Sequence, residues 1–215
     1  MKSIQIISEK IQITESCHLY DDGSILSVDI DIATWLEVNY CFIAKKTEEK
    51  VSYHRHIMIW KDSIFHGTSI AIDSLDLQII SEITGDNAKS NLDILALATD
   101  SIQISVEGVA KVANPYRQVF TRVDQTNILI WKGSRVRWVP KLEINTDDIE
   151  GGHSCRIHRL GGESLFYLTS RGLTEKNAET LLLNSEILRH LKTVEPSERE
   201  KACHDIHMRL AGKNV

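Results

Sequence analysis

The sequence has little cysteine, little proline and no long apolar run. The four cysteines of the 215-residue chain stand at wide, irregular spacings, so they form neither a disulfide framework nor a CxxC zinc pair. No uncharged apolar stretch reaches the roughly 18 residues of a transmembrane helix. The start, Met1-Lys2-Ser3, does not lead into the apolar region of a signal peptide. We therefore expect a soluble, cytoplasmic protein without a membrane partner.

The common nucleotide-binding and hydrolytic motifs are also missing. The chain has no GxxxxGK[ST] loop, no GxGxxG at the start of a helix, no GxSxG elbow and no HExxH. Thirty acidic against 25 basic residues give a net charge of −5, which argues against a nucleic-acid partner. With 42% hydrophobic and 26% charged residues, the chain is not a disordered one. We expect a globular protein that hydrolyses no nucleotide in the P-loop manner.

Isoleucine and leucine are distributed unevenly along the chain. Of 27 isoleucines, 25 precede residue 158, whereas ten of 20 leucines follow residue 159. β-branched residues favour strands, and leucine is a good helix former. The sequence therefore predicts a β domain at residues 1–160 and a helical segment at residues 161–215. The net negative charge lies in the β part, because eight acids balance eight bases from Glu163 onward.

Before this break, apolar and polar residues alternate over short runs. Period two indicates strands with one buried face. The runs recur about every ten residues and include Ile11–Ile13, Val28–Ile32, Leu36–Phe42, Ile57–Ile59, Ile70–Ile72, Leu75–Ile79, Ile102–Val106, Ile128–Ile130 and Leu142–Ile144. A sandwich or barrel and a β-solenoid both fit such spacing. Asp22-Gly23 is the only tight-hairpin dipeptide, which mildly favours a solenoid or jelly roll.

After the break, the pattern predicts three helices. The first runs from Glu163 to Arg171 and is stopped by Gly172. Thr174 caps the second. Its predicted apolar stripe contains Ala178, Leu181, Leu182, Ile187, Leu188 and Leu191. Pro196 and Ser197 interrupt, and the third helix carries Ala202, Ile206 and Leu210 before Gly212.

The densest group of chemically active residues follows Asp147 and Asp148, in the segment Gly151-Gly152-His153-Ser154-Cys155. On a strand, His153 and Cys155 face the same side. Imidazole and thiolate suit zinc, iron or a cluster. The alternative is a Gly-Gly turn followed by an ordinary strand. Two further pairs are weaker candidates. His54 and His56 are too few for a metal site and are better explained as a solvated strand face, and Cys203 with His207 is better explained by chance surface spacing.

Residues 138–183 contain two separated blocks, Pro140-Lys141-Leu142-Glu143-Ile144-Asn145-Thr146-Asp147-Asp148 and Leu165-Phe166-Tyr167-Leu168-Thr169-Ser170-Arg171-Gly172. Together they resemble the C-terminal signature of the SufB/SufD family of iron–sulfur cluster assembly scaffolds. That signature is a P-x-L-E-I-x-x-D-D-V segment, a small-residue step into S-H-G-A, and the helix L-F-Y-L-x-S-R-G. The residues that match it in register are Pro140, Leu142, Glu143, Ile144, Asp147, Asp148, His153, Leu165, Phe166, Tyr167, Leu168, Ser170, Arg171 and Gly172. The chain thus looks like a short SufD-like member.

The resemblance implies a mainly β fold, a right-handed parallel β-helix followed by C-terminal α-helices. It further implies pairing through the β-helix with a second SufB/SufD-like chain or with itself. The C-terminal helices would dock a SufC-like ABC ATPase through Leu165, Phe166, Tyr167, Arg171 and Gly172. His153 would lie at the seam between scaffold chains, near a transient iron–sulfur cluster. Asp147, Asp148, Gly151 and Gly152 would shape the turn and the interface.

This chain departs from the family pattern at one step. Gly151-Gly152-His153-Ser154-Cys155 replaces S-H-G-A, so Cys155 is an added candidate ligand. Three hypotheses follow. The first is a non-enzymatic assembly scaffold that works with a separate ATPase and binds no nucleotide itself. The second is a structural subunit of such a complex without a ligand role, and the third is a small metal- or thiol-dependent enzyme that uses His153, Cys155 and His158.

Overall fold

A computed structural model describes residues 1–44, 51–73, 75–99, 103–113, 115–130 and 132–211. The strands are β1 (Lys2–Gln5), β2 (Lys10–Ile13), β3 (Cys17–Asp21), β4 (Ser27–Ile32), β5 (Glu37–Ile43), β6 (Val51–Ile59), β7 (Ile64–Ile72), β8 (Leu75–Ile83), β9 (Lys89–Ala98), β10 (Gln103–Val112), β11 (Val119–Leu129), β12 (Arg135–Ile144) and β13 (Ile149–Arg159). The helices are α1 (Gly162–Ser170), α2 (Glu175–His190), the 3-10 turn η1 (Leu191–Thr193) and α3 (Pro196–Ala211). Strand length grows from four residues in β1 to 11 in β13.

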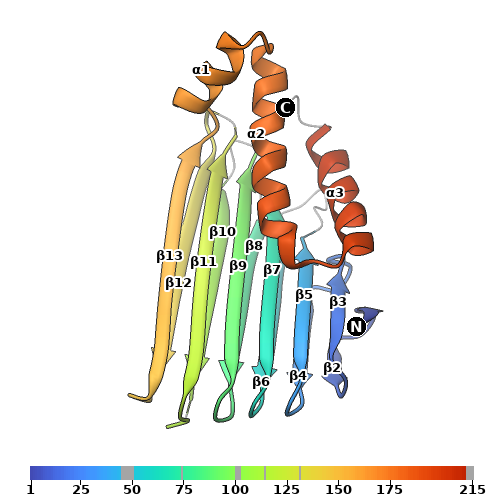
Figure 1. Cartoon of the computed structure of the whole chain (residues 1–215), viewed down its shortest axis with the longest axis vertical. Helices are drawn as coiled ribbons and strands as arrows, with labels where there is room; N and C mark the ends of the chain where they lie inside the picture. The colour runs from blue at the N-terminus through green and yellow to red at the C-terminus, as the bar shows by residue number, and fades with distance from the viewer. Residues whose placement is uncertain (45–50, 74, 100–102, 114, 131, 212–215) are drawn as a thin grey trace.

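Consecutive strands alternate between two parallel sheets. The seven odd-numbered strands form one sheet and the six even-numbered strands the other, each in sequence order. Each rung of two consecutive strands therefore stacks on the rung before it (Figure 1). The pairing is parallel throughout the part of the chain that the structure describes, for example between β9 and β11. The predicted parallel β-helix with C-terminal helices is confirmed, and the sandwich or barrel is not formed.

The interior of the β-helix is built from ladders of β-branched residues. One ladder runs through Ile32, Ile59, Ile83, Val112 and Ile144, each beside the next in register. All but Ile144 are fully buried. β-branched side chains pack well on a pleated surface, which explains why isoleucine is concentrated before residue 158.

One buried ion pair interrupts the apolar interior near the N-terminus. The Arg55 guanidinium is fully buried and donates to both carboxylate oxygens of Asp21, at 2.7 and 3.2 Å. It also donates to three backbone carbonyls and lies 4.3 Å from the centre of the Phe42 ring. Asp21 accepts a further hydrogen bond from the Tyr40 hydroxyl at 2.9 Å. The pair therefore ties together β3, β5 and β6.

The turns of four successive rungs repeat one backbone conformation. Trp35, Asp62, Asn87 and Gln118 have positive φ angles of 65°, 59°, 56° and 53°. The amide of each of the first three donates to a carbonyl in the next turn, as Asn87 does to Arg117 at 3.0 Å. This left-handed conformation strains residues other than glycine. The stacked hydrogen bonds hold the strained residues in place.

The helices cover part of the outer face of the seven-stranded sheet. α2 and α3 lie across this face, and α1 lies beyond the ends of β11 and β13 (Figure 1). Ile70, Ile72 and Leu97 point outward and pack with Ile187 and Ile206 of the helices. The runs at Ile70–Ile72 and Ile128–Ile130 are therefore strands as predicted, but they face the helices instead of the β-helix interior.

The predicted helix ends agree closely with the structure. Gly172 has φ of 95° and follows α1, and Thr174 accepts a hydrogen bond from the Asn177 amide at the start of α2. Gly212, the predicted end of the third helix, lies outside the described residues. No helix among the described residues has the length and apolarity needed to cross a membrane. The strands end at Arg159, but the division into two domains stays a prediction.

The predicted stripe of α2 is partly wrong. Ala178, Ile187 and Leu191 are buried as predicted, and Leu183, which the stripe omitted, is buried as well. Leu181 and Leu188 are 50% and 52% exposed. The helix faces the sheet with one side only, so these two leucines lie beside the buried face and not on it.

Candidate functional site

The β-helix ends in a rung that nothing covers within the described part of the chain. β12 and β13 are the edge strands of the two sheets at the same end of the solenoid. Inward-facing Val136, Leu142 and Ile149 pack against the core below and stay only partly buried. We call the inner faces of β12 and β13 the open end. It exposes apolar surface together with two strand edges, an arrangement suited to contact with another chain.

His153 and Cys155 lie on the inner side of β13, at the open end. They pair in register with Val123 and Gln125 of β11, whose side chains point into the β-helix. The predicted same-face placement is therefore what the structure has. His153 is exposed and Cys155 half-buried. Ile157, two residues further along the same side, is 49% exposed.

The Cys155 sulfur has a hydrogen-bond donor. Asn127 Nδ2 lies 3.2 Å from Cys155 Sγ. Burial raises the pKa of the Cys155 thiol, and the hydrogen bond from Asn127 opposes this effect only in part. Thiolate is the form that binds metal, so ligation here would release a proton.

The residues before His153 leave the strand open to approach. A Cβ on Gly152 would meet nothing within 4 Å, and one on Gly151 would come to 3.2 Å from Ile144 Cδ1. Asp147 and Asp148 are exposed in the turn between β12 and β13. The Asp148 carbonyl accepts from the Val119 amide at 3.3 Å, which ties this turn to the previous rung. Their assigned roles in shaping the turn and the interface stay predictions.

The other cysteines and histidines do not gather around this point. Burial raises the pKa of the Cys17 and Cys41 thiols, which lie inside the protein. His54 pairs with Gln78 on the outer face of the six-stranded sheet, and His207 contacts Asn184. No three His, Cys, Asp or Glu side chains among the described residues form a group that could hold a metal ion. His153 and Cys155 alone therefore do not complete a ligand set.

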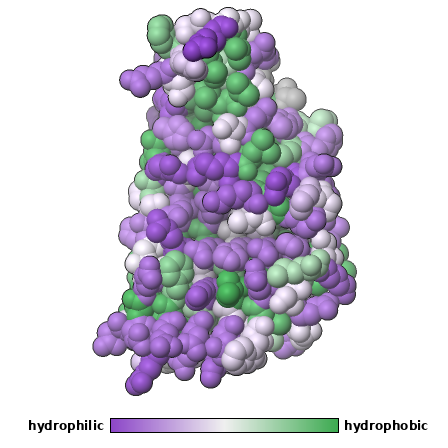
Figure 2. Space-filling view, in the orientation of Figure 1, coloured by the Kyte–Doolittle hydropathy of each residue, from purple (hydrophilic) through white to green (hydrophobic). Residues whose placement is uncertain are grey.

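A second candidate surface lies between α1 and α2. Phe166, Tyr167, Leu181 and Leu182 line a groove of about 750 Å³. Phe166 is 75% and Tyr167 56% exposed. Figure 2 shows hydrophobic atoms at the top of the molecule, where Figure 1 places α1 and the adjoining end of α2.

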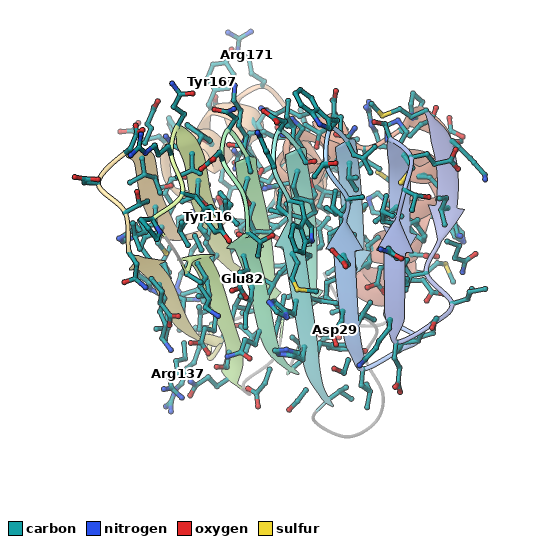
Figure 3. The ribbon with its side chains drawn as sticks, turned by 90° about the horizontal axis from the view of Figure 1, so that it is seen from below. Asp29, Glu82, Tyr116, Arg137, Tyr167 and Arg171 are labelled. Carbon is teal, nitrogen blue, oxygen red and sulfur yellow. The ribbon has the colours of Figure 1, made fainter. Side chains whose placement is uncertain are left out.

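At this groove, the Arg171 guanidinium lies 5.0 Å from the Tyr167 ring centre. Both side chains project away from the sheets in Figure 3. Leu165 and Gly172 belong to the same segment, with Leu165 half-buried and Gly172 exposed. Of the predicted docking residues, Phe166 and Tyr167 line the groove and Arg171 contacts Tyr167, whereas Leu165 and Gly172 do not line it. The docking role of all five stays a prediction.

Sequence reasoning missed three polar residues below the open end. Thr121, Gln125 and Asn127 point inward from β11 and are at most 2% exposed. Their spacing of two and four residues in Val119–Leu129 was a usable signal, because Gln125 and Asn127 occupy inward positions that are apolar in β9. Without the register between strands, that signal does not identify Cys155 as their neighbour.

Comparison with known proteins identifies the family. The family model described as "SUF system FeS cluster assembly, SufBD core domain" matches residues 13–186. The chain belongs to the SufBD family. A SufBD family iron–sulfur cluster assembly protein of Mycobacterium leprae is 40% identical over 77 residues, 34% of this chain and 20% of that protein.

Two further SufBD relatives match longer parts of the chain. The iron–sulfur cluster assembly protein SufD of Escherichia coli is 28% identical over 87 residues, 40% of this chain and 21% of SufD. A SufBD family protein of Methanothermobacter thermautotrophicus is 25% identical over 150 residues, 70% of this chain and 36% of the relative. The matched parts thus span 20–36% of these three relatives' lengths.

Proposed function

We propose that this chain is a scaffold subunit of iron–sulfur cluster assembly that works with a separate ATPase. The observation that carries the proposal is the open end, where a SufBD core domain presents a histidine and a cysteine on an uncovered inner face. The iron–sulfur cluster is then the cargo of the scaffold. His153 contributes an imidazole ligand and Cys155 a thiolate ligand, both from the inner side of β13. Both ligand types occur in protein-bound clusters.

The remaining ligands would come from a second chain across the open end. Two ligands are too few to hold a cluster, and the described residues offer no third His, Cys, Asp or Glu nearby. The partner is a second SufB/SufD-like chain or another copy of this one. Its β-helix would cover the half-buried apolar residues of β12 and β13 and bring its own ligands to the seam.

Anaerobic reconstitution with iron and sulfide tests the ligand role. The chain, mixed with a SufC-like ATPase and ATP, should acquire the visible absorption of a cluster. His153→Ala and Cys155→Ser should each reduce that absorption, whereas His158→Ala should not, because His158 is exposed on the outer side of the same strand. Normal reconstitution by the His153→Ala and Cys155→Ser double variant would instead favour a structural subunit without a ligand role.

Sedimentation velocity tests the pairing surface. Ile157→Asp places a charge on the inner side of the open end, and His158→Asp places one on the neighbouring outer side. Burying an isoleucine side chain is worth about 1.5–3 kcal/mol. Association of the Ile157→Asp chain should therefore weaken about tenfold or more, and that of His158→Asp should not change. Equal association of both variants would place the interface elsewhere.

The groove between α1 and α2 is the proposed docking surface for the SufC-like ABC ATPase. Its exposed aromatic residues are of the kind that dominate protein interfaces. Phe166→Asp should abolish co-purification with the ATPase. The control is Leu188→Asp, which adds the same charge to an exposed leucine of α2 that does not line the groove. If both variants retain the ATPase, the docking surface lies outside this groove.

A further inference from the structure

The last covered rung holds two carboxamide side chains, Gln125 and Asn127, at inner positions that are apolar in the rung before it. Thr121, Gln125 and Asn127 of β11 form what we call the polar floor, because they lie directly under the inner side of β13. In β9, which pairs with β11 on the side away from β13, Gln125 lies beside Ile94 and Asn127 beside Ala96; both of these apolar residues are fully buried. A buried amide without a partner costs about 1–3 kcal/mol, so these side chains are a poor choice for packing alone.

Hydrogen bonds fix the orientation of the Asn127 amide. Its Nδ2 lies 3.2 Å from the Arg156 carbonyl oxygen and 3.2 Å from Cys155 Sγ. A carbonyl oxygen only accepts, so the nitrogen and not the oxygen of this amide must face β13. On the other side, Gln125 Nε2 donates to Asn127 Oδ1 at 2.8 Å. Cys155 Sγ therefore receives an N–H and acts as an acceptor.

Two oxygens of the polar floor are buried without a hydrogen-bond partner. They are Gln125 Oε1 and Thr121 Oγ1. In the ladder, Gln125 lies beside Cys155, and Thr121 beside Gly151, which has no side chain of its own. Unpaired buried acceptors of this kind favour the arrival of a cation or of the water bound to one. The hydroxyls of Ser69 and Ser90, deeper in the interior, are unpaired as well, so the Gln125 amide oxygen, beside Cys155 in the ladder, is the observation that bears on this end independently of the cysteine.

We propose that Asn127, held by Gln125, is a positioning residue that fixes the Cys155 sulfur as a ligand for a soft metal cation at the open end. This inference rests on the proposed ligand role of Cys155. Residues that hydrogen-bond a metal ligand orient it, and their replacement commonly weakens metal binding by about 10–100-fold.

Nuclear magnetic resonance of the metal-free chain tests the contact itself. Cys155→Ala should shift the side-chain amide resonances of Asn127, because it removes the sulfur that accepts the N–H. Cys203→Ala should leave them unchanged, since that cysteine lies on α3. Unchanged Asn127 resonances in Cys155→Ala would overturn the inference.

Anaerobic titration with Co²⁺ alone tests the positioning role on the full-length chain. Asn127→Leu fills the space without a donor, and Asn127→Ala removes the donor without added bulk. Both should bind Co²⁺ about 10–100-fold more weakly and shift the sulfur-to-cobalt absorption band. Asn91→Leu, on the outer face of β9, should bind within about twofold of the unchanged chain. Circular dichroism checks that each variant is folded.

The possible outcomes separate the two proposals. Equal Co²⁺ binding and an unchanged band in both Asn127 variants would overturn the positioning role while the ligand role stands. Unlike a cluster, Co²⁺ can complete its coordination with water, so the absence of a sulfur-to-cobalt band in the unchanged chain would overturn the ligand role of Cys155 and the positioning role with it. A band that weakens in both Asn127 variants and in Cys155→Ser, but not in Asn91→Leu, supports both.

Discussion

Removing the charge of Asp21 should destabilise the protein far more than removing a surface charge. Asp21→Asn keeps the shape of the side chain, but it leaves the Arg55 cation without a counter-ion in a site where both side chains are at most 2% exposed. Breaking a buried ion pair in this way costs about 3–5 kcal/mol. The backbone carbonyls that also accept from Arg55 cannot replace the lost negative charge.

Urea denaturation measures this difference against a matched control. With a urea dependence of about 1–3 kcal/mol per molar, Asp21→Asn should lower the unfolding midpoint by about 1–5 M. Glu15→Gln breaks an exposed ion pair of similar length, in which Glu15 Oε1 lies 3.1 Å from Lys2 Nζ. The Glu15 side chain is 57% exposed and the Lys2 side chain 68%. It should cost no more than about 1 kcal/mol. Equal midpoints for both variants would refute the claim that the buried pair needs its charge.

Three further predictions concern the helices, acid stability and the turns. Ile187→Ala should cost about 2–5 kcal/mol of unfolding free energy and raise hydrogen exchange across α2, because Ile187 is fully buried against the sheet. Burial raises the pKa of Glu82, but hydrogen bonds from His56 and Lys111 outweigh it and lower the pKa below 4.5. A lowered folded-state pKa gives stability that is present above pH 4.5 and lost as the pH falls through the folded-state value. As the pH is lowered below 4.5, the urea midpoint of Glu82→Gln should therefore fall less than that of the unchanged chain. Gln118→Gly should raise the melting temperature, gaining about 0.5–1 kcal/mol, because Gln118 is exposed and holds a φ of 53°.

Periodicity predicts the strands of this fold but not how they pair. Alternation records which residues point inward, and it is the same in a sandwich, a barrel and a solenoid. The parallel order follows from contacts between residues 15 to 32 positions apart, such as Lys2 with Cys17 and Gln103 with Arg135. Only the resemblance of the C-terminal segment to a family separated these folds before the structure was known.

Where strands have two buried faces, the apolar pattern misleads. Ile70 and Ile72 alternate with polar or small residues as a half-buried strand would, yet they contact helices on the outside. The same limit affects α2, where Leu181 continues the apolar spacing but lies toward the groove. A pattern counts apolar positions, and it does not say which neighbour will cover them.

The site residues likewise divide into those that the sequence predicts and those that depend on strand pairing. His153 and Cys155 could be predicted because they are close in sequence and strand geometry places them on one side. Asn127 could not, because its contact with Cys155 depends on the register of two strands separated by one full turn of the solenoid.

In the seven-stranded sheet, one level of inner-facing residues becomes polar toward the open end. At one level the chain places Ile94 in β9, Gln125 in β11 and Cys155 in β13. A further rung stacked on β13 in register would need apolar inner residues, as the ladders below have. The chain instead ends its β-helix with groups that hydrogen-bond or ligate. Under the proposed function, this change in polarity would suit a surface that holds a polar ligand between two chains.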